Sequence, residues 1–492
     1  MAQLIVKKKI ALSLPSDNDR RADDQRIKDT LGLAPLAIPL SVLKKVSAEI
    51  KKQRGALSCI VGRTGNGYKL IDIGSERSYS LALDLGTTNL AFLLYDNVSE
   101  QTVLSQSFEN PQIAFGSDIL TRMHHAMSAR AEEVYGSLKE GINLAVKTLC
   151  EQAGITTNDV HAFVVAGNTV MSHFFLGLDI STIPVDPFVP VVRTPGFFAA
   201  GELALDINPE ALVYVFPNAG SYVGGDIVAG IIAAGIHRSN KISVLIDVGT
   251  NAEVVIGNKD WMLVGAGAAG PALEEGITRI GKRASTGIIY DVTIRGEKIT
   301  CKTFDEHAPE GICGSGMVSL LFELYNAGTI DKSGVLNPDG SNVTIVEGEP
   351  AYAIACGCGD ALMIRQSELQ NFMKSKAAMF TLLLVLVRSV GLGFKDIARV
   401  FVSGALGTGI DANKAVAIGM LPAWPAAIVK PLGNSSLEGA RLLLADGRLV
   451  QTIDAVIAKI TYKHMHDDPE FMKEYLGAVF IPHTNPELLK AT

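Results

Sequence analysis

The feature that most constrains this chain is an internal duplication. Near residue 84 and again near residue 247, an apolar segment runs into the pattern Asp-x-Gly-Thr and out into a second apolar segment. Each copy is followed by helical spacing, and then by an apolar strand that ends in a polar or glycine-rich turn. One such turn would be weak evidence, since Asp-Gly turns are common in hairpins. Two copies in matching contexts predict two similar α/β lobes with a cleft between them.

A turn of this kind is suited to binding phosphate. Glycine and hydroxyl residues at a hairpin tip bring several backbone N–H groups to one point, and this favours an anion. Gly86 and Gly249 allow a close approach that a Cβ atom would block. Asp84 and Asp247 repel phosphate, so we expect them to hold Mg²⁺ through water or to orient the attacking water. The predicted phosphate-binding residues are Gly86, Thr87, Thr88, Asn89, Gly249, Thr250 and Asn251.

Two further segments complete the predicted nucleotide site. Residues 402–409 form a strand that ends in a glycine-rich turn, where Gly404 and Gly407 would let a flat nucleoside lie against the backbone. Taken alone, this segment is also typical of an ordinary strand-to-helix turn. Asp226 opens an apolar helix directly ahead of the second phosphate strand. Capping that helix is its simplest role, and capping is compatible with facing the site.

Composition limits the classes of function. The net charge is −7 and the 44 Lys and Arg residues are spread along the chain, unlike the basic surface of a nucleic-acid-binding protein. The most apolar segment, residues 377–387, is far shorter than the roughly 20 residues of a membrane span, so we predict a buried helix there. The start of the chain lacks a signal-peptide pattern. We therefore expect a cytoplasmic protein with no membrane or nucleic-acid partner.

Three segments are expected along the chain. Residues 1–76 form a small α/β domain, with strands at 5–14, 56–62 and 68–73 and a helix at 41–53. A polar turn at 74–77 separates this domain from a more apolar block. Residues 77–240 are predicted to form the first lobe and residues 241–492 the second, whose C-terminal segment returns to the first.

The loops resemble those of the actin, sugar-kinase and chaperone ATPase superfamily. Residues 84–88 resemble its first phosphate loop, residues 247–250 its second, and residues 402–409 its adenosine loop. The resemblance implies a duplicated actin-like (ribonuclease H-like), two-lobed α/β fold that binds ATP and Mg²⁺.

The same resemblance assigns roles to single residues. Asp84, Asp226 and Asp247 become the catalytic carboxylates that place metal and water, and Asp84 and Asp247 hold Mg²⁺ through water molecules. The helix that begins at Asp226 resembles the first connecting helix. Gly314 and Gly316, which open another helix, resemble part of the second connection.

Several phrases resemble one branch of the superfamily, the reductive activators of corrinoid proteins. They include residues 110–118, 165–173, 267–274, 314–317, 411–422 and 432–440. The resemblance covers essentially the whole chain, and residues 1–76 look like the middle domain of that family. It implies an ATP-hydrolysing activator that is a homodimer and that restores cob(II)alamin to cob(I)alamin in a corrinoid methyltransferase protein.

One departure concerns the electron donor. Family members usually carry an iron–sulfur domain, and this sequence has no C-x₄-C-x₂-C run and no cysteine after Cys358. We therefore expect a separate ferredoxin or flavoprotein to supply electrons. Cys356 and Cys358 could alternatively provide four thiolates to one cluster across a two-fold dimer, or be small residues in a glycine-rich turn. His124, His125 and His173 lie on helical stretches, where a structural role is expected.

Two rival functions remain open. A small-molecule kinase on the same fold would use Asp226 as a catalytic base in a substrate pocket. A non-redox, nucleotide-dependent module could instead remodel a corrinoid or iron–sulfur protein. Activity with free sugars or acyl acids distinguishes the first from the activator, and ATP hydrolysis without cobalt reduction distinguishes the second.

Overall fold

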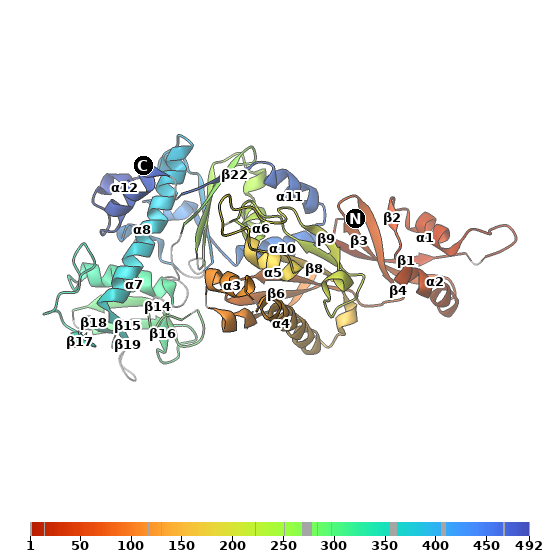
Figure 1. Cartoon of the computed structure of the whole chain (residues 1–492), viewed down its shortest axis with the longest axis horizontal. Helices are drawn as coiled ribbons and strands as arrows, with labels where there is room; N and C mark the ends of the chain where they lie inside the picture. The colour runs from red at the N-terminus through yellow and green to blue at the C-terminus, as the bar shows by residue number, and fades with distance from the viewer. Residues whose placement is uncertain are drawn as a thin grey trace. The chain divides into compact units, whose positions relative to one another are not determined.

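The computed structural model (Figure 1) describes residues 2–13, 15–116, 118–128, 130–221, 223–249, 251–267, 278–282, 284–296, 298–354, 362–404, 410–465 and 468–491. The chain divides into two compact units. The first comprises Met1–Ala233 with Ser436–Ala458, and the second comprises Ala234–Ser435 with Lys459–Thr492.

The first unit begins with a small sheet of strand order β1-β3-β4-β2, on which two helices pack. Its elements are β1 (Ile5–Ala11), α1 (Asp23–Leu31), β2 (Leu36–Ala37), α2 (Leu40–Lys52), β3 (Ala56–Thr64) and β4 (Gly67–Ile73). Helix α2 buries Val42, Val46 and Ile50, the four-residue spacing of an amphipathic helix. The strands expected at 56–62 and 68–73 and the helix expected at 41–53 are confirmed, and the strand expected at 5–14 ends at Ala11. The sequence pattern did not predict α1 and β2.

The first repeat is a six-stranded sheet of order β7-β6-β5-β8-β10-β9. Its strands are β5 (Tyr79–Leu85), β6 (Asn89–Asp96), β7 (Gln101–Glu109), β8 (Val160–Gly167), β9 (Gly196–Ala199) and β10 (Leu212–Val215). Its helices are α3 (Ile119–Ala126), α4 (Ala131–Gln152), α5 (Thr169–Leu176) and α6 (Gly225–Ala234). β8 is buried along its whole length, as expected for a parallel strand in the middle of a sheet.

The second repeat is a six-stranded sheet of order β21-β20-β11-β12-β13-β22. Its strands are β11 (Ser243–Val248), β12 (Ala252–Gly257), β13 (Met262–Gly267), β20 (Arg399–Gly404), β21 (Val429–Gly433) and β22 (Ile460–Lys463). The series β7-β6-β5-β8-β10 and β13-β12-β11-β20-β21 have the same order and the same parallel or antiparallel sense at every pairing. The duplicated fold is therefore confirmed.

A long insertion follows β13. It contains β14 (Ile288–Arg295), β15 (Lys298–Thr303), β16 (Gly311–Ile312), α7 (Gly314–Asn326), β17 (Val343–Val346), β18 (Glu349–Ile354), β19 (Leu362–Arg365) and α8 (Gln366–Ser389). The remaining helices are α9 (Ala412–Ala417), α10 (Ser435–Ala445), α11 (Leu449–Ile457) and α12 (Pro469–Ala478). Helix α12 packs beside α8 (Figure 1).

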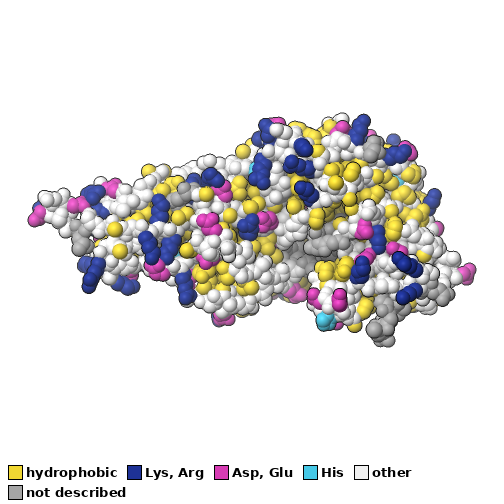
Figure 2. Space-filling model, turned by 180° about the vertical axis from the view of Figure 1, so that it is seen from behind, with side chains coloured by type: hydrophobic (Ala, Val, Ile, Leu, Met, Phe, Trp, Pro, Cys, Tyr) yellow, Lys and Arg dark blue, Asp and Glu magenta, His cyan; other side chains and the backbone are white. Residues whose placement is uncertain are grey.

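The apolar segment at residues 377–387 lies within α8, and every one of its side chains is buried. The prediction of a buried helix is therefore confirmed. No helix in the described part of the chain combines the length and hydropathy needed to cross a membrane. On the face shown in Figure 2, Lys and Arg side chains alternate with Asp, Glu and uncharged side chains rather than forming one basic surface.

Helix α8 also carries a buried cation, Lys376, whose ammonium group is 2.7 Å from Ala478 O, 2.8 Å from Phe480 O and 3.2 Å from Pro482 O. Three carbonyl acceptors match the three N–H donors of an ammonium group. Burial opposes that charge and lowers the pKa of Lys376 to about 7. The side chain ties the C-terminal segment to α8.

Replacement of Lys376 by Met should leave these three carbonyl groups without their donor. We expect the free energy of unfolding to fall by about 2–4 kcal/mol, because unsatisfied buried polar groups are costly. Chemical denaturation measures this loss, and limited proteolysis should show earlier cleavage near residue 480. Lys374→Met, at an exposed position of the same helix, is the control and should change neither measurement. Equal effects of the two variants would contradict the tether.

Candidate functional site

The two Asp-x-Gly-Thr turns occupy equivalent places in the two sheets. Asp84 of β5 lies opposite Ala166 of β8, and Asp247 of β11 lies opposite Ser403 of β20. In both repeats these strand pairs are parallel, so the turns that follow them leave the sheet at its carboxyl edge. That edge is where ligands bind in open α/β sheets.

The first turn is held by two asparagines from outside it. The Asn110 side-chain amide donates to Gly86 O at 2.9 Å, and the Asn110 backbone N–H donates to Thr88 O at 2.8 Å. Asn168, which caps α5 by accepting from the Met171 N–H, donates its amide to the Thr87 hydroxyl at 3.1 Å. Both asparagines lie in the phrases 110–118 and 165–173, to which the sequence alone assigned no role at the site.

An arginine completes the support of this turn. Arg122 of α3 donates from Nη1 to Thr87 O and from Nε to Gly116 O, the latter at 2.7 Å. The carbonyl groups of Gly86, Thr87 and Thr88 are thus all engaged by donors outside the turn. Because C=O and N–H point in opposite directions across a trans peptide, the N–H groups that follow these carbonyls are directed away from those donors. This orientation is that of an anion-binding turn.

Helix α6 begins against the same region. A Cβ atom on Gly224 would lie 2.3 Å from Asn168 Cα, and one on Gly225 would lie 2.6 Å from Phe216 Cβ, so both glycines are required by close packing. Asp226 follows in the first turn of α6, with its carboxylate 2.8 Å from the Ile227 N–H. A half-buried carboxylate is thereby held next to the turn after β8.

In the second repeat, Gly249 donates its N–H to Asn251 O at 2.9 Å and closes the turn after β11. Gly404, at the end of β20, has φ +71°, and a Cβ atom there would lie 2.2 Å from Val248 O and 2.7 Å from Asp247 Oδ1. The end of β20 therefore passes directly against the end of β11. Thr250 and Gly407 lie outside the described residues.

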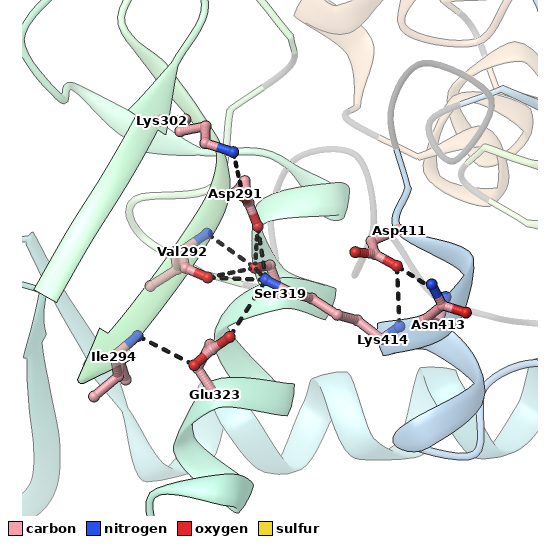
Figure 3. A network of polar contacts seen from close by, with 9 residues as sticks. All are labelled: Asp291, Val292, Ile294, Lys302, Ser319, Glu323, Asp411, Asn413 and Lys414. Atoms are coloured by element: carbon pink, nitrogen blue, oxygen red, sulfur yellow. Dashed lines mark hydrogen bonds and ion pairs between the residues drawn. The ribbon is translucent and has the colours of Figure 1, made fainter. Parts of the chain in front are cut away.

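Residues 405–409 are likewise outside the described part, but α9, which follows them, is firmly anchored (Figure 3). Asp411 caps α9 by accepting from the N–H groups of Asn413 and Lys414. Lys414 then reaches Asp291 of β14 at 2.7 Å and Ser319 of α7 at 2.6 Å (Figure 3). Burial opposes the charge of Asp291, yet the bonds from Lys414 and its neighbours hold its pKa down at about 2.

The helix that the resemblance assigns to the second connection is α7. Gly314 and Gly316 open α7, which packs on β14, and a Cβ atom on Gly316 would lie 2.3 Å from Ile289 O. Close helix-to-strand packing accounts for that glycine. The helix that follows β21, as α6 follows β10 in the first repeat, is α10.

The thiols in the described residues are buried. Cys59, Cys150 and Cys313 are free and lie in separate places, in β3, in α4 and before α7. Burial raises the pKa of Cys59 to about 12 and that of Cys150 to about 11, which disfavours the thiolate form that binds metals. No group of residues with the makeup of a metal site occurs among the described residues. The alternative cluster ligands Cys356 and Cys358 lie outside them.

His173 is a structural residue, and the hypothesis of a structural role for it is confirmed. It is fully buried, its Nδ1 lies 2.7 Å from Thr169 O, and its Nε2 accepts from the Val192 N–H at 3.3 Å. These two bonds require the neutral ring. Burial lowers the pKa of His173 below its ordinary value near 6.5.

Stability should therefore fall as the pH drops below about 6.5, because the unfolded chain then binds a proton that the folded chain excludes. The slope reaches at most about 1.4 kcal/mol per pH unit for one group. Burial also lowers the pKa of His483, which adds in the same direction. Denaturation between pH 5 and 7 measures the slope. His173→Gln should flatten it, whereas His307→Gln, at an exposed position, should not; an unchanged slope in the first variant would contradict this account.

Comparison with known proteins agrees with this architecture. A family model described as the C-terminal domain of RACo, the ASKHA domain, matches residues 241–492, and a model of the RACo middle region matches residues 79–239. We expected residues 1–76 to resemble the middle domain; the middle-region model instead falls on the first repeat.

Individual relatives extend over most of the chain. The corrinoid activation enzyme RamQ of Eubacterium limosum is 30% identical over 431 residues, 84% of this chain and 72% of the relative. A methylated-amine-specific corrinoid protein reductase of Methanosarcina barkeri is 23% identical over 422 residues, 79% of this chain and 74% of the relative. A solved reductive activator for corrinoid, iron–sulfur protein superposes with a TM-score of 0.92 at 32% identity, covering 99% of this chain and 80% of its own. The chain therefore belongs to the RACo family of reductive activators of corrinoid proteins, with an actin-like ASKHA fold.

Proposed function

We propose that this protein uses ATP binding and hydrolysis to return a corrinoid methyltransferase protein from cob(II)alamin to cob(I)alamin. The single observation that carries the proposal is the pair of equivalent phosphate turns at Asp84 and Asp247, in a chain whose family is that of corrinoid activators. Reduction of cob(II)alamin is unfavourable for ordinary donors. The free energy of nucleotide binding would hold the corrinoid partner in a form that can be reduced. Hydrolysis of the nucleotide would then release the partner.

The residues present fit MgATP. At Gly86 a Cβ atom would lie 2.5 Å from Asn89 O, and at Gly404 it would lie 2.2 Å from Val248 O, so these two positions exclude a side chain and present bare backbone. We propose that Asp84 and Asp247 hold Mg²⁺ through water and that Asp226 helps to orient the attacking water. Bound Mg²⁺ supplies charge neutralisation of the phosphate chain. The turn residues at 86–89 and 249–251 would bind phosphate, and Gly404 with Gly407 would contact adenosine.

Electrons are proposed to come from a separate ferredoxin-like protein or flavoprotein. Support comes from the thiols of the described residues, because Cys59, Cys150 and Cys313 are buried and dispersed. A homodimer is proposed on the family resemblance alone. We also retain the division into residues 1–76, 77–240 and 241–492 as a proposal for the functional segments.

The test is anaerobic reduction of a cob(II)alamin protein, followed by absorbance, with ATP and reduced ferredoxin each added or omitted. We expect cob(I)alamin only when both are present. Cobalt reduction that proceeds equally without ATP would overturn the ATP requirement. ATP hydrolysis without cobalt reduction would favour the remodelling module, and phosphorylation of free sugars or acyl acids would favour the kinase.

A further inference from the structure

A charge imbalance lies behind the first phosphate turn. Arg122 is fully buried, and two of its three guanidinium nitrogens donate to backbone carbonyls of Thr87 and Gly116. The third, Nη2, is buried and has no hydrogen-bond partner among the residues that the structure describes. Carbonyl groups satisfy hydrogen bonds but carry no net charge, so these contacts leave the cation uncompensated.

No carboxylate of the described residues pairs with this guanidinium. Asp118, the acidic residue whose charge acts on it, caps α3 instead and is bonded to the Thr121 N–H and hydroxyl. The other fully buried arginine of the first unit, Arg26, does pair with a carboxylate, that of Asp23. Unpaired buried charges are costly, so Arg122 requires a counter-charge from elsewhere.

We infer that Arg122 is a positioning residue for the phosphate turn and that the phosphate groups of the bound nucleotide supply its counter-charge. The inference rests on the proposed ATP site. Arg122 binds the carbonyl side of Thr87, so the next N–H faces the opposite side, where the phosphate chain is proposed to lie. The side chain both orients the donor and places a positive charge behind it.

The guanidinium remains charged at neutral pH. Burial lowers the pKa of Arg122 to about 10, which is still well above neutrality. With little water around the group, its attraction for phosphate is screened much less than that of a surface arginine. Arg122 should therefore affect ligands in proportion to their phosphate charge and should not affect the nucleoside.

The test compares ATP with adenosine by calorimetry on the full chain. Arg122→Met should weaken ATP binding about 10- to 100-fold, because the turn loses the positive charge behind it and the charge-assisted hydrogen bond from Arg122 to Thr87 O. Adenosine affinity should stay within about 2-fold of that of the unaltered protein. Arg122→Lys keeps the charge but not the planar fork, so its affinity for ATP should lie between those of the unaltered protein and Arg122→Met. The control is Arg26→Met, which removes a buried arginine from α1, a helix beside the N-terminal sheet, and should leave both affinities unchanged.

Two results for Arg122→Met would contradict the inference. Equal losses for ATP and adenosine in Arg122→Met would show general damage to the site, and no loss for ATP would show that the charge has no role; either result overturns the inference. If Arg122→Met does not fold, Arg122→Gln, which also removes the charge, takes its place, and unaltered ATP affinity in that variant would overturn the inference as well. Failure of the unaltered protein to bind ATP would instead refute the proposed function.

Discussion

Asp247→Asn is expected to lower the rate of ATP hydrolysis by about 10²- to 10⁴-fold, the range over which a positioned catalytic group contributes. The substitution keeps the shape of the side chain and removes its charge, so the water molecules around Mg²⁺ lose their orienting anion. Asp247 lies in β11, between β12 and β20, and its strand pairing is made by the backbone. The fold should therefore survive.

Steady-state phosphate release measures the loss, and circular dichroism establishes that the fold persists. Asp260→Asn alters an exposed carboxylate in the turn between β12 and β13 and should retain full turnover. Full turnover in Asp247→Asn would contradict the site assignment. Loss of both turnover and fold would mean that the carboxylate is needed for structure, and nucleotide-dependent stabilisation of Asp84→Asn would then test the site.

Gly404→Ala is expected to destabilise the protein by about 2–5 kcal/mol and to abolish nucleotide binding. The left-handed φ of +71° costs an alanine roughly 1–2 kcal/mol, and the new Cβ atom 2.2 Å from Val248 O adds roughly 1–3 kcal/mol of overpacking. Relief of this clash would push β20 away from Asp247, so the site would also lose its geometry. Chemical denaturation and calorimetry with ATP measure the two effects.

Gly391 offers a closely matched control for this experiment. It has the same φ, +71°, and a Cβ atom there would meet nothing within 4 Å. Gly391→Ala should therefore show only the backbone cost, about 1–2 kcal/mol, and bind ATP normally. Similar losses in the two variants would mean that the contact with Val248 has no effect of its own.

Much of the architecture could be predicted from sequence because it depends on residue types and apolar spacing within short segments. The two Asp-x-Gly-Thr turns are recognised by their residue types, and apolar periodicity predicts strands such as β8 and helices such as α8. The supports of the first turn could not be found in this way. Arg122 lies on a short helix, where a lone arginine in sequence resembles any solvated side chain. Its burial arises only when α3 packs beside a turn 35 residues earlier in the chain.

The second connection shows the same limit. The resemblance assigns Gly314 and Gly316 to the second connection, but the close approach of Gly316 to Ile289 O is visible only in the structure. The equivalence of α10 with α6 depends on the pairing of β21 with β20, which joins segments that local sequence does not relate. Asn110 and Asn168 were visible as parts of family phrases, but their convergence on one turn is a property of the tertiary structure.

The close packing of α10 against α6 determines which fragments of this protein can fold and which segments can be exchanged with a relative. A Cβ atom on Gly439 of α10 would lie 2.1 Å from Ala229 O, and Leu4 N–H donates to Leu444 O, so residues 436–458 fold with the first unit although they come late in the chain. Expression of residues 241–492 alone would strip α10 and α11 of their packing surface and favour aggregation. Hybrids with a relative should exchange residues 234–435 together with residues 459–492, which keeps α10 and α11 with the first unit and the C-terminal segment with α8.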